Sequence, residues 1–504
     1  MMRRILPRLL SESAIYGLGG VANQALAVIL VPIDANVLGT RSYGLPALVN
    51  TTLNLALMIT TLALPQAFFR WYLKESDDER QRQEVLGVSL SLRLVVSSVG
   101  LLSFTVAALP LTMLLAGRLD ALPILLIVGP IIFFDSINAV PLSFLRAERR
   151  PRPYALISLT RAALGSILII VFVVIFQLGV LGVVIGSMGS ATVSTALGFA
   201  IMSRSRRITF HWNGRLARAM LAFSLPIVPA AIAGWTLNLS DRYLLQAFSS
   251  SPQAGHTTVG VYAAGYTVGL VINALAIAPF TLAWGAAYWE ISRHRDARRV
   301  ISRVMTAFAV FSCAMALGLS TLGTDAMRLL LHPEFEPGRF VIPFSAFAYV
   351  LYGIYTIAST GLNLEAQTRW LPVTIGGAAL ANVAMNLALI PTLGYMGAAL
   401  STLIGYALLA LFSGYMSQRY YPVPWEYGRL LIALVLGFGL AEAALQGPDS
   451  LLWRLACLIA YAPILLLLRV VRRTDLGLML RALRERGDVA ETDADLASDL
   501  RKDQ

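Results

Sequence analysis

The stretch WLPVTIGGAALANVAMNLALIPTLGYMGAALSTLIGYALLALFSGYMSQ, residues 370–418, contains no charged residue and no histidine. A helix that crosses a lipid bilayer needs about 20 consecutive, mostly apolar residues. The stretch is therefore long enough for two crossings. The segment IPTLG at residues 390–394 supplies the proline and glycine that favour a turn between them. We predict a helical hairpin that spans a membrane.

Uncharged stretches occur elsewhere as well, at residues 44–69 and 260–289. Over the whole chain 57% of the residues are hydrophobic, 13% are charged, and the mean hydropathy is +0.69. A soluble domain carries about 25% charged residues. This composition excludes a soluble globule and predicts an all-α polytopic membrane protein.

The formal net charge of +12 originates in short loops. Arginines gather in alternate loops between the apolar stretches, and the loops in between hold few cations, such as Arg118 and Arg339. Because cytoplasmic loops carry an excess of Lys and Arg, an even number of spans with both termini cytoplasmic is predicted. A nucleic-acid partner is not needed to explain the charge. The fourteen expected transmembrane helices are 13–38, 44–69, 85–109, 121–145, 153–177, 179–203, 216–245, 257–287, 301–324, 340–364, 370–391, 395–418, 428–446 and 451–470.

Two pairs of segments recur at offsets of 215 and 216 residues. LGVLGVVIGS (178–187) is similar to LGYMGAALST (393–402), and SYGLPALVN (42–50) is similar to TVGVYAAGY (258–266). The repeat predicts two parallel six-helix lobes around a central cavity, as in transporters that work by alternating access. The predicted parts are lobes at 1–210 and 211–420, two accessory transmembrane helices at 421–484 and a disordered acidic tail at 485–504.

Several motifs resemble those of polysaccharide transporters and oligosaccharide flippases in the multidrug/oligosaccharidyl-lipid/polysaccharide (MOP) exporter superfamily. The resemblance covers about residues 10–420 and implies two six-helix lobes around a central cavity. The motifs are LGTRSYG (38–44), LALPQAFFR (62–70), LRAERRPRPYAL (145–156), SDRYLL (240–245), VGVYAAGY (259–266) and IPTLGYMGAAL (390–400).

The resemblance also implies a function. Members of this branch flip lipid-linked oligosaccharides, typically undecaprenyl-diphosphate sugars, from the inner to the outer leaflet of the cell inner membrane. They serve the biosynthesis of cell-surface polysaccharide such as lipopolysaccharide. The implied partners are the lipid-linked oligosaccharide, the lipid bilayer, and the glycan polymerase and glycosyltransferases of the same pathway.

One residue departs from this branch. Asp34 lies in the first expected helix, where an acidic residue resembles the multidrug and toxic compound extrusion branch, which couples transport to a cation such as H⁺ or Na⁺. The alternatives are therefore a cation-coupled multidrug exporter of the same fold and a peptidoglycan-precursor flippase. From another class, a membrane glycan polymerase is a further alternative.

Asp241 and Arg242 interrupt an apolar segment, with Asn238 about one turn earlier on the same side. Charged groups inside a bilayer are costly and usually face a cavity or a partner. About 26 residues beyond a helix start near Leu216, the pair reaches the outer interface at ~1.5 Å per residue. Together with Asp34, these residues either take part in gating or ion coupling or anchor a helix end.

Three arginines are candidates for binding a lipid diphosphate, because charge-assisted hydrogen bonds to phosphate are strong. Arg70 closes the second expected span, and Arg93 and Arg161 lie inside later ones. The alternative for Arg70 is an anchor at the cytoplasmic surface. For Arg93 and Arg161 it is an internal ion pair, with Asp135 or Glu148 as partner.

Uncharged polar residues are better suited to sugar hydroxyls. Asn50 and Asn54 are four residues apart and share a helix face. The alternative for all of these residues is hydrogen bonding between helices, typically worth about 0.6 kcal/mol. The sugar-binding candidates are Asn23, Gln24, Asn50, Asn54 and Asn273.

No catalytic motif is evident. The only lysines are Lys74 and Lys502, so a Walker lysine motif is absent, and there is no zinc-protease helix or nucleophile elbow. The two cysteines, Cys313 and Cys457, lack metal-ligand spacing. We expect a transporter without cofactor or metal site, driven by an ion gradient, the membrane potential or the substrate gradient.

Overall fold

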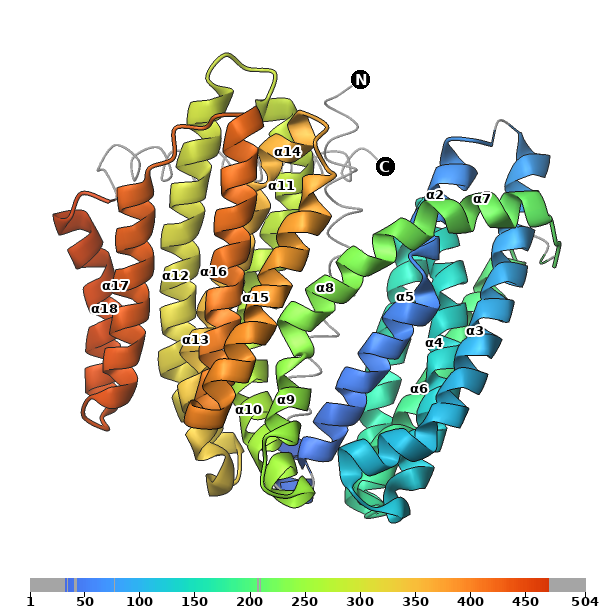
Figure 1. Cartoon of the computed structure of the whole chain (residues 1–504), viewed down its shortest axis with the longest axis horizontal. Helices are drawn as coiled ribbons and strands as arrows, with labels where there is room; N and C mark the ends of the chain where they lie inside the picture. The colour runs from blue at the N-terminus through green and yellow to red at the C-terminus, as the bar shows by residue number, and fades with distance from the viewer. Residues whose placement is uncertain are drawn as a thin grey trace, which may run out of the picture.

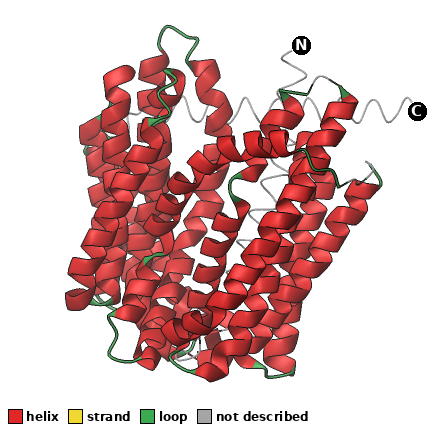
Figure 2. Cartoon of the chain, turned by 45° about the vertical axis from the view of Figure 1, so that its right-hand side comes forward, coloured by secondary structure: helices red, strands yellow, loops and turns green. Residues whose placement is uncertain are grey.

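The computed structural model describes residues 32–33, 35–39, 43–76, 78–205, 208 and 210–470. In these ranges every regular element is a helix (Figure 2), and twelve helices are long and apolar enough to cross a membrane. Leu451–Leu467 is a shorter apolar helix. The predicted all-α polytopic membrane fold is confirmed. The first expected span, 13–38, lies largely outside the described residues, so the count of fourteen stays a prediction.

The helices gather into two groups (Figure 1). The first, here called the N-terminal bundle, begins with the span Tyr43–Leu73, whose last part is α2. The remaining members follow in chain order and pack as neighbours, with α3 on α4, α4 on α6 and α5 on α6. The bounds are α2 Leu64–Leu73, α3 Glu79–Ala116, α4 Leu122–Ala147, α5 Pro151–Ile170, the π-helix η2 Val171–Ile175 and α6 Gly179–Ser203.

A bent connection leads from the first group to the second. The helix α7, Gly214–Ser224, packs against α2 and α3, and α8, Val228–Leu239, then crosses toward the second group (Figure 1). A short turn, Leu225–Ile227, joins them, and α9, Asp241–Ala247, completes the segment.

The second group, the C-terminal bundle, contains α8 to α16. The predicted hairpin at 370–418 is present in it as α15 and α16, which pack closely on each other, and α13 packs against α16 and α10. The last two helices, α17 and α18, pack against α12 (Figure 1). The bounds are α10 Pro252–Ile272, the π-helix η4 Asn273–Ile277, α11 Ala278–Ile291, α12 Ala297–Leu330, η5 Pro333–Phe340, α13 Val341–Ala358, α14 Thr360–Leu364, α15 Trp370–Leu393, α16 Tyr395–Tyr420, α17 Tyr427–Gln446 and α18 Leu451–Leu467.

Local signals explain where several helices begin. The Asp78 side chain accepts a hydrogen bond from the backbone N–H of Gln81 at the start of α3, and Asn213 caps α7 in the same way. Ser251 caps α10, which has Pro252 in its first turn. Such side chains satisfy backbone donors that have no partner within the helix.

Charge marks the two ends of the molecule. The turns at residues 70–76, 78–82, 146–152, 210–215 and 292–299 carry many of the loop arginines and lie at one end, here called the basic end. In Figure 1 this end is at the top, and α2 and α7 belong to it. The two bundles come together at the opposite end and diverge toward the basic end (Figure 1).

The sequence repeat has a counterpart in backbone geometry. Gly179 and Gly394, equivalent at an offset of 215 residues, both have positive φ, 56° and 57°, just where α6 and α16 begin. Three residues on, Gly182 and Gly397 both touch the backbone of the preceding helix, where a Cβ would lie 2.9 Å and 2.4 Å from the nearest atom. The two hairpins, α5–α6 and α15–α16, are thus built alike. The predicted domain boundaries remain predictions.

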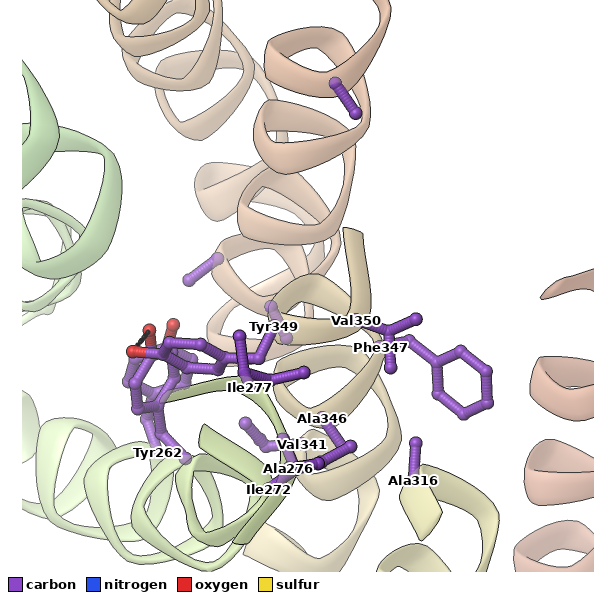
Figure 3. Packing of buried hydrophobic residues seen from close by; sticks show 14 of the residues in the cluster. Tyr262, Ile272, Ala276, Ile277, Ala316, Val341, Ala346, Phe347, Tyr349 and Val350 are labelled. Carbon is purple, nitrogen blue, oxygen red and sulfur yellow. Dashed lines mark hydrogen bonds between the residues drawn. The ribbon is translucent and has the colours of Figure 1, made fainter. Parts of the chain in front are cut away.

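The core of the C-terminal bundle lies among α10, α12 and α13. Figure 3 shows Ile272, Ile277 and Val341 packed together, with Phe347 and Ala316 on the far side. At the near edge of this cluster lie the rings of Tyr262 and Tyr349 (Figure 3). An apolar core thus positions tyrosine hydroxyls at its border.

Candidate functional site

A cavity of about 300 Å³ lies between the two bundles. The N-terminal bundle contributes Asn50, Asn54 and Ser187 to its lining, and the C-terminal bundle contributes Arg242 and Thr267. The rest of the lining is mostly apolar, with residues such as Val128, Ile131 and Leu239. Apolar walls with a few convergent polar groups are typical of ligand sites.

Asn50 and Asn54 lie on one helix face, as their spacing predicts. The Asn54 amide donates to the Asn50 carbonyl oxygen at 2.8 Å and to the Asn50 side-chain oxygen at 3.2 Å. Both residues are exposed at the cavity. Their shared face is confirmed, and a role in sugar binding stays a prediction.

Arg242 is the charged side chain of this lining. It is only 6% exposed, and its Nη1 donates to Asp241 Oδ1 at 3.2 Å and to the Asn238 carbonyl oxygen at 3.4 Å. Its guanidinium carbon lies 4.8 Å from the ring centre of Tyr266. A cation over an aromatic face is electrostatically favourable. The arginine therefore sits in a fixed orientation at the wall of the cavity.

Asp241 points away from the cavity into the C-terminal bundle. It is 2% exposed, and its Oδ2 accepts hydrogen bonds from the hydroxyls of Tyr262 on α10 and, at 3.3 Å, Thr402 on α16. A buried charge is tolerated when it is paired and hydrogen-bonded. The two adjacent residues thus differ in position: Asp241 is buried in the C-terminal bundle, and Arg242 lines the cavity.

Asn238 ties the same region to two more helices. Its Oδ1 accepts a hydrogen bond of 2.5 Å from the Tyr266 hydroxyl and one of 3.2 Å from the Tyr349 hydroxyl of α13. These tyrosines and Thr402 were not among the sequence candidates. Tyr262 and Tyr266 are four residues apart in the VGVYAAGY motif, so a shared helix face was the available signal.

A second ion pair lies in the N-terminal bundle. Arg161 donates to both carboxylate oxygens of Asp135, through Nε and Nη2 at 2.9 Å each, and its Nη1 donates to Ser190 Oγ at 2.6 Å. The internal ion pair with Asp135 is confirmed. Because all three nitrogens have protein partners, this geometry favours a structural clamp among α4, α5 and α6.

Arg93 is 2% exposed and holds a bent backbone. Its Nη1 donates to the carbonyl oxygens of Thr60 and Thr61, at 3.1 Å and 3.0 Å. The next two residues, Leu62 and Ala63, have φ of 47° and 51°, in the left-handed region. A bend frees helix carbonyls, and Arg93 satisfies two of them. An ion pair of Arg93 with Asp135 or Glu148 is not observed among the described contacts.

The remaining candidates are spread out. Arg70 lies at the basic end, half-exposed, 3.4 Å from Glu75 and against the rings of Trp71 and Phe223. Asn273 is half-buried at the start of η4 and does not belong to the cavity lining described above. The candidates Asn23, Gln24 and Asp34 lie outside the described residues.

Contacts between the bundles close the end opposite to the basic end. Gly44 lies so near the backbone of α10 that a Cβ would be 1.9 Å from the His256 carbonyl oxygen. His256 Nε2 is 2.8 Å from the Leu115 carbonyl oxygen, and the hydroxyls of Thr52 and Tyr243 are 2.7 Å apart. These contacts belong to α3, α9, α10 and the span Tyr43–Leu73, so they join the two bundles beside the cavity.

A third group of charges fixes α18 to α12, away from the cavity. Arg454 donates to Asp325 at 2.5 Å and to Asp449 at 2.9 Å, and Asp449 also accepts a hydrogen bond from Arg328. Asp449 lies in the turn between α17 and α18. The hydrogen bonds from Arg328 and Arg454 lower the pKa of its carboxyl to about 2. Within the described ranges no group of three metal-ligating side chains occurs.

Comparisons with solved structures show the fold. The lipid II flippase MurJ, in an inward closed conformation, superposes with a TM-score of 0.73 at 15% identity, over 92% of this chain and 99% of that one. A multidrug resistance MATE family transporter of the MOP superfamily matches in its inward-facing form, with a TM-score of 0.58 at 15% identity, over 82% and 97%. An outward-facing form matches with a TM-score of 0.55 at 17% identity, over 82% and 95%.

Sequence comparison is more specific about the family. No curated protein sequence matches the chain. The family described as polysaccharide biosynthesis protein, however, matches residues 9–284, which is more than half of the 504 residues. Together with the MOP-type fold, this match confirms the predicted resemblance, and the chain belongs to the polysaccharide biosynthesis protein family.

Proposed function

We propose that this protein flips lipid-linked oligosaccharides, with undecaprenyl-diphosphate sugars as the substrate class, from the inner to the outer leaflet. Movement of the two bundles relative to each other opens the cavity alternately to the inner and to the outer leaflet. The product serves cell-surface polysaccharide biosynthesis. Family membership and the flippase and transporter folds that superpose on the chain support a transport function rather than catalysis.

The proposed substrate class rests on the residues that line the cavity. Of the described lining residues, Arg242 is charged and none is acidic. The guanidinium reaches the lining while its paired carboxylate, Asp241, lies inside the C-terminal bundle, so the site favours an anionic headgroup over a cationic drug. Asn50, Asn54 and Thr267 add donors and acceptors for sugar hydroxyls. The Nε and Nη2 of Arg242 would bind the diphosphate.

The gating assignment follows from the closed end. We assign Asp241, Arg242 and Asn238 to the part of the C-terminal bundle that reorganises when the cavity opens on that side. They sit next to Tyr243, whose hydroxyl meets Thr52 across the bundle interface. Asp34 is assigned with them from its place in the sequence. A coupling ion, H⁺ or Na⁺, would act through these aspartates.

The distribution of arginine supports the orientation. The basic end faces the cytoplasm of the inner membrane in this proposal, with both termini on that side. Headgroups then enter where Arg70 stands and leave at the end that the Gly44 contact closes. A glycan polymerase and glycosyltransferases of the same pathway would act before and after this step.

A peptidoglycan-precursor flippase is the second candidate, since the superposition with lipid II flippase MurJ covers nearly the whole of both chains. A cation-coupled multidrug exporter fits less well, because the described lining lacks an acidic residue. A glycan polymerase has no support from the family or from the superposed structures.

Purified protein in liposomes tests the proposal. Fluorescent undecaprenyl-diphosphate oligosaccharide, lipid II and a cationic dye are offered separately, and transfer between leaflets is followed by quenching from one side. We expect transfer of the oligosaccharide lipid in the wild type and its loss in Arg242→Gln. Transfer of lipid II alone would identify the second candidate, and transport of the dye alone would identify an exporter.

A further inference from the structure

We infer that Arg242 couples anion binding to proton uptake. One nitrogen of its guanidinium holds Asp241, and Arg242 also lines the cavity. An anion that binds the remaining nitrogens there shares the cation with Asp241 and favours a proton on that carboxylate. This inference rests on the proposed function, because the anion is the diphosphate of the lipid substrate.

The nitrogens of the Arg242 guanidinium differ in whether they have protein partners. Nη1 makes both of its described hydrogen bonds, to Asp241 Oδ1 and to the Asn238 carbonyl oxygen. Among the described residues none accepts a hydrogen bond from Nε or Nη2, although the side chain lines the cavity. That pair of nitrogens is the edge with which arginine binds phosphate oxygens in bidentate fashion.

Asp241 has few charged neighbours. It is 2% exposed, and Arg242 is the cation that neutralises it. The titratable groups that face it from the neighbouring helices are tyrosines, Tyr262 and Tyr266 on α10 and Tyr406 on α16, with Tyr349 on α13 beside them. His256, also on α10, contacts the Leu115 carbonyl oxygen instead. The neighbouring helix α15 carries no charged side chain. Within this described environment, charge at Asp241 is balanced by Arg242 or by a bound cation.

A proton suits this site better than a metal ion does. Sodium and other hard cations need several oxygen ligands, and a guanidinium nitrogen already lies 3.2 Å from Asp241 Oδ1. A metal ion at this oxygen would face the positive charge of Arg242. A proton needs no coordination shell, and the carboxyl can keep its hydrogen bonds with Tyr262 and Thr402 in rearranged form.

Anion binding at Arg242 and protonation of Asp241 then favour each other by thermodynamic linkage. An anion at Nε and Nη2 competes with Asp241 for the field of one guanidinium, so Asp241 binds a proton more readily when the anion is present. Reciprocity requires that a protonated Asp241 increases the affinity for the anion by the same factor. The loaded cavity then carries one negative charge fewer, which reduces the cost of holding a diphosphate within the membrane.

Isothermal titration calorimetry with inorganic diphosphate tests this on the purified full chain. Titrations in buffers of different ionisation enthalpy give the number of protons taken up per diphosphate bound. The probe's own protonation cancels when the wild type is compared with Asp241→Asn. We expect greater uptake by the wild type, up to one proton, and an affinity that weakens by up to about tenfold per pH unit as pH rises. Asp241→Asn should lose most of this pH dependence.

Two further variants secure the result. Asp325→Asn is the matched control, since Asp325 also pairs with an arginine, Arg454, but lies away from the cavity. It should behave as the wild type does. Tyr262→Phe removes one hydroxyl donor from Asp241 while keeping both charges. It should move the pH dependence of binding to higher pH, and it serves in place of Asp241→Asn if that variant does not fold.

The outcomes separate the inference from the proposed function. Equal proton uptake by the wild type and Asp241→Asn, or a pH profile unchanged by Tyr262→Phe, overturns the linkage but leaves the flippase proposal standing. Absence of diphosphate binding in the wild type, together with no transfer of lipid-linked oligosaccharide, overturns the proposed function and the linkage with it.

Discussion

Each bundle contains an Asp–Arg pair, partly buried in the N-terminal bundle and buried in the C-terminal bundle, and the pairs differ in which guanidinium nitrogens have protein partners. Arg161 in the N-terminal bundle donates hydrogen bonds from Nε and both Nη nitrogens to Asp135 and Ser190. Arg242 in the C-terminal bundle lines the cavity and has described hydrogen bonds only through Nη1, to Asp241 and to the Asn238 carbonyl oxygen. The same pair of residue types thus links helices in the N-terminal bundle, whereas in the C-terminal bundle the arginine keeps two nitrogens without a described hydrogen-bond acceptor.

The largest expected effect comes from replacing each pair with apolar residues. Asp241→Leu with Arg242→Met should lower transport about 10- to 100-fold or more, because a hydrogen bond to a charged group contributes about 1.5–3 kcal/mol. Asp135→Leu with Arg161→Met should keep transport within about threefold, since well-packed apolar replacements of buried ion pairs are often neutral. The liposome transfer assay compares the two. Equal losses would erase the difference between the pairs.

Replacing Arg161 alone tests whether the pair with Asp135 stabilises the folded protein. Arg161→Met leaves the partly buried Asp135 without its partner, and the free energy of unfolding should fall by about 1–3 kcal/mol. Adding Asp135→Leu should restore most of it. Denaturant unfolding in detergent, followed by tryptophan fluorescence, measures both. No recovery in the double variant would mean that the pair is more than a clamp.

Access to Arg242 depends on the closed end of the bundles. In Gly44→Ala a Cβ would meet the His256 carbonyl oxygen at 1.9 Å, so the bundles should separate there. We expect a longer distance between spin labels at Leu119 and Phe248, together with a transport loss of about tenfold or more. Gly234→Ala, where a Cβ meets nothing within 4 Å, is the control. Distances that match those of the wild type would argue against closure at this contact.

The bend in the span Tyr43–Leu73 gives a smaller effect. Arg93→Met removes the donor to the Thr60 and Thr61 carbonyl oxygens, and each buried group left without a partner costs about 1–3 kcal/mol. Ala63→Gly should stabilise the same bend, because glycine adopts positive φ readily. Thermal unfolding of both variants measures the opposed shifts. A stabilised Arg93→Met would contradict the clamp at this bend.

The smallest effect is expected at the exposed charges between α17 and α18. The pKa of Asp449, lowered to about 2, lies below its unfolded value of about 3.9. Its stabilising contribution is therefore present above about pH 4 and is lost as pH falls through about 2. Asp449→Asn should flatten acid unfolding in that window and leave transport unchanged. A loss of transport would draw this charge cluster into the mechanism.

The all-α membrane fold could be predicted from the sequence because each membrane helix is a local run of apolar residues without charge. The uncharged stretch 370–418 became α15 and α16, and the glycines at 179 and 394 marked equivalent turns. Helical spacing also placed Asn50 and Asn54 on one face. The Asp135–Arg161 pair could be named as an alternative, because both residues needed a partner inside an apolar bundle.

The site was only partly predictable because it depends on helix rotation. Adjacent residues on a helix point in different directions, so Asp241 and Arg242 could not be assigned to core and cavity without the packing of α10 and α16. Tyr349 lies 83 residues beyond Tyr266, and only the tertiary fold brings both hydroxyls to Asn238. The bend at Leu62 and Ala63 carries no glycine, so the need for Arg93 there was hidden.

A cryo-electron microscopy map of the full chain with a bound prenyl diphosphate tests the central claim most directly. We expect diphosphate density between the two bundles, within hydrogen-bond distance of Arg242 Nε and Nη2, while Arg161 keeps its bonds to Asp135. Density at Arg161 with Arg242 unoccupied, or a headgroup bound outside the space between the bundles, would contradict it.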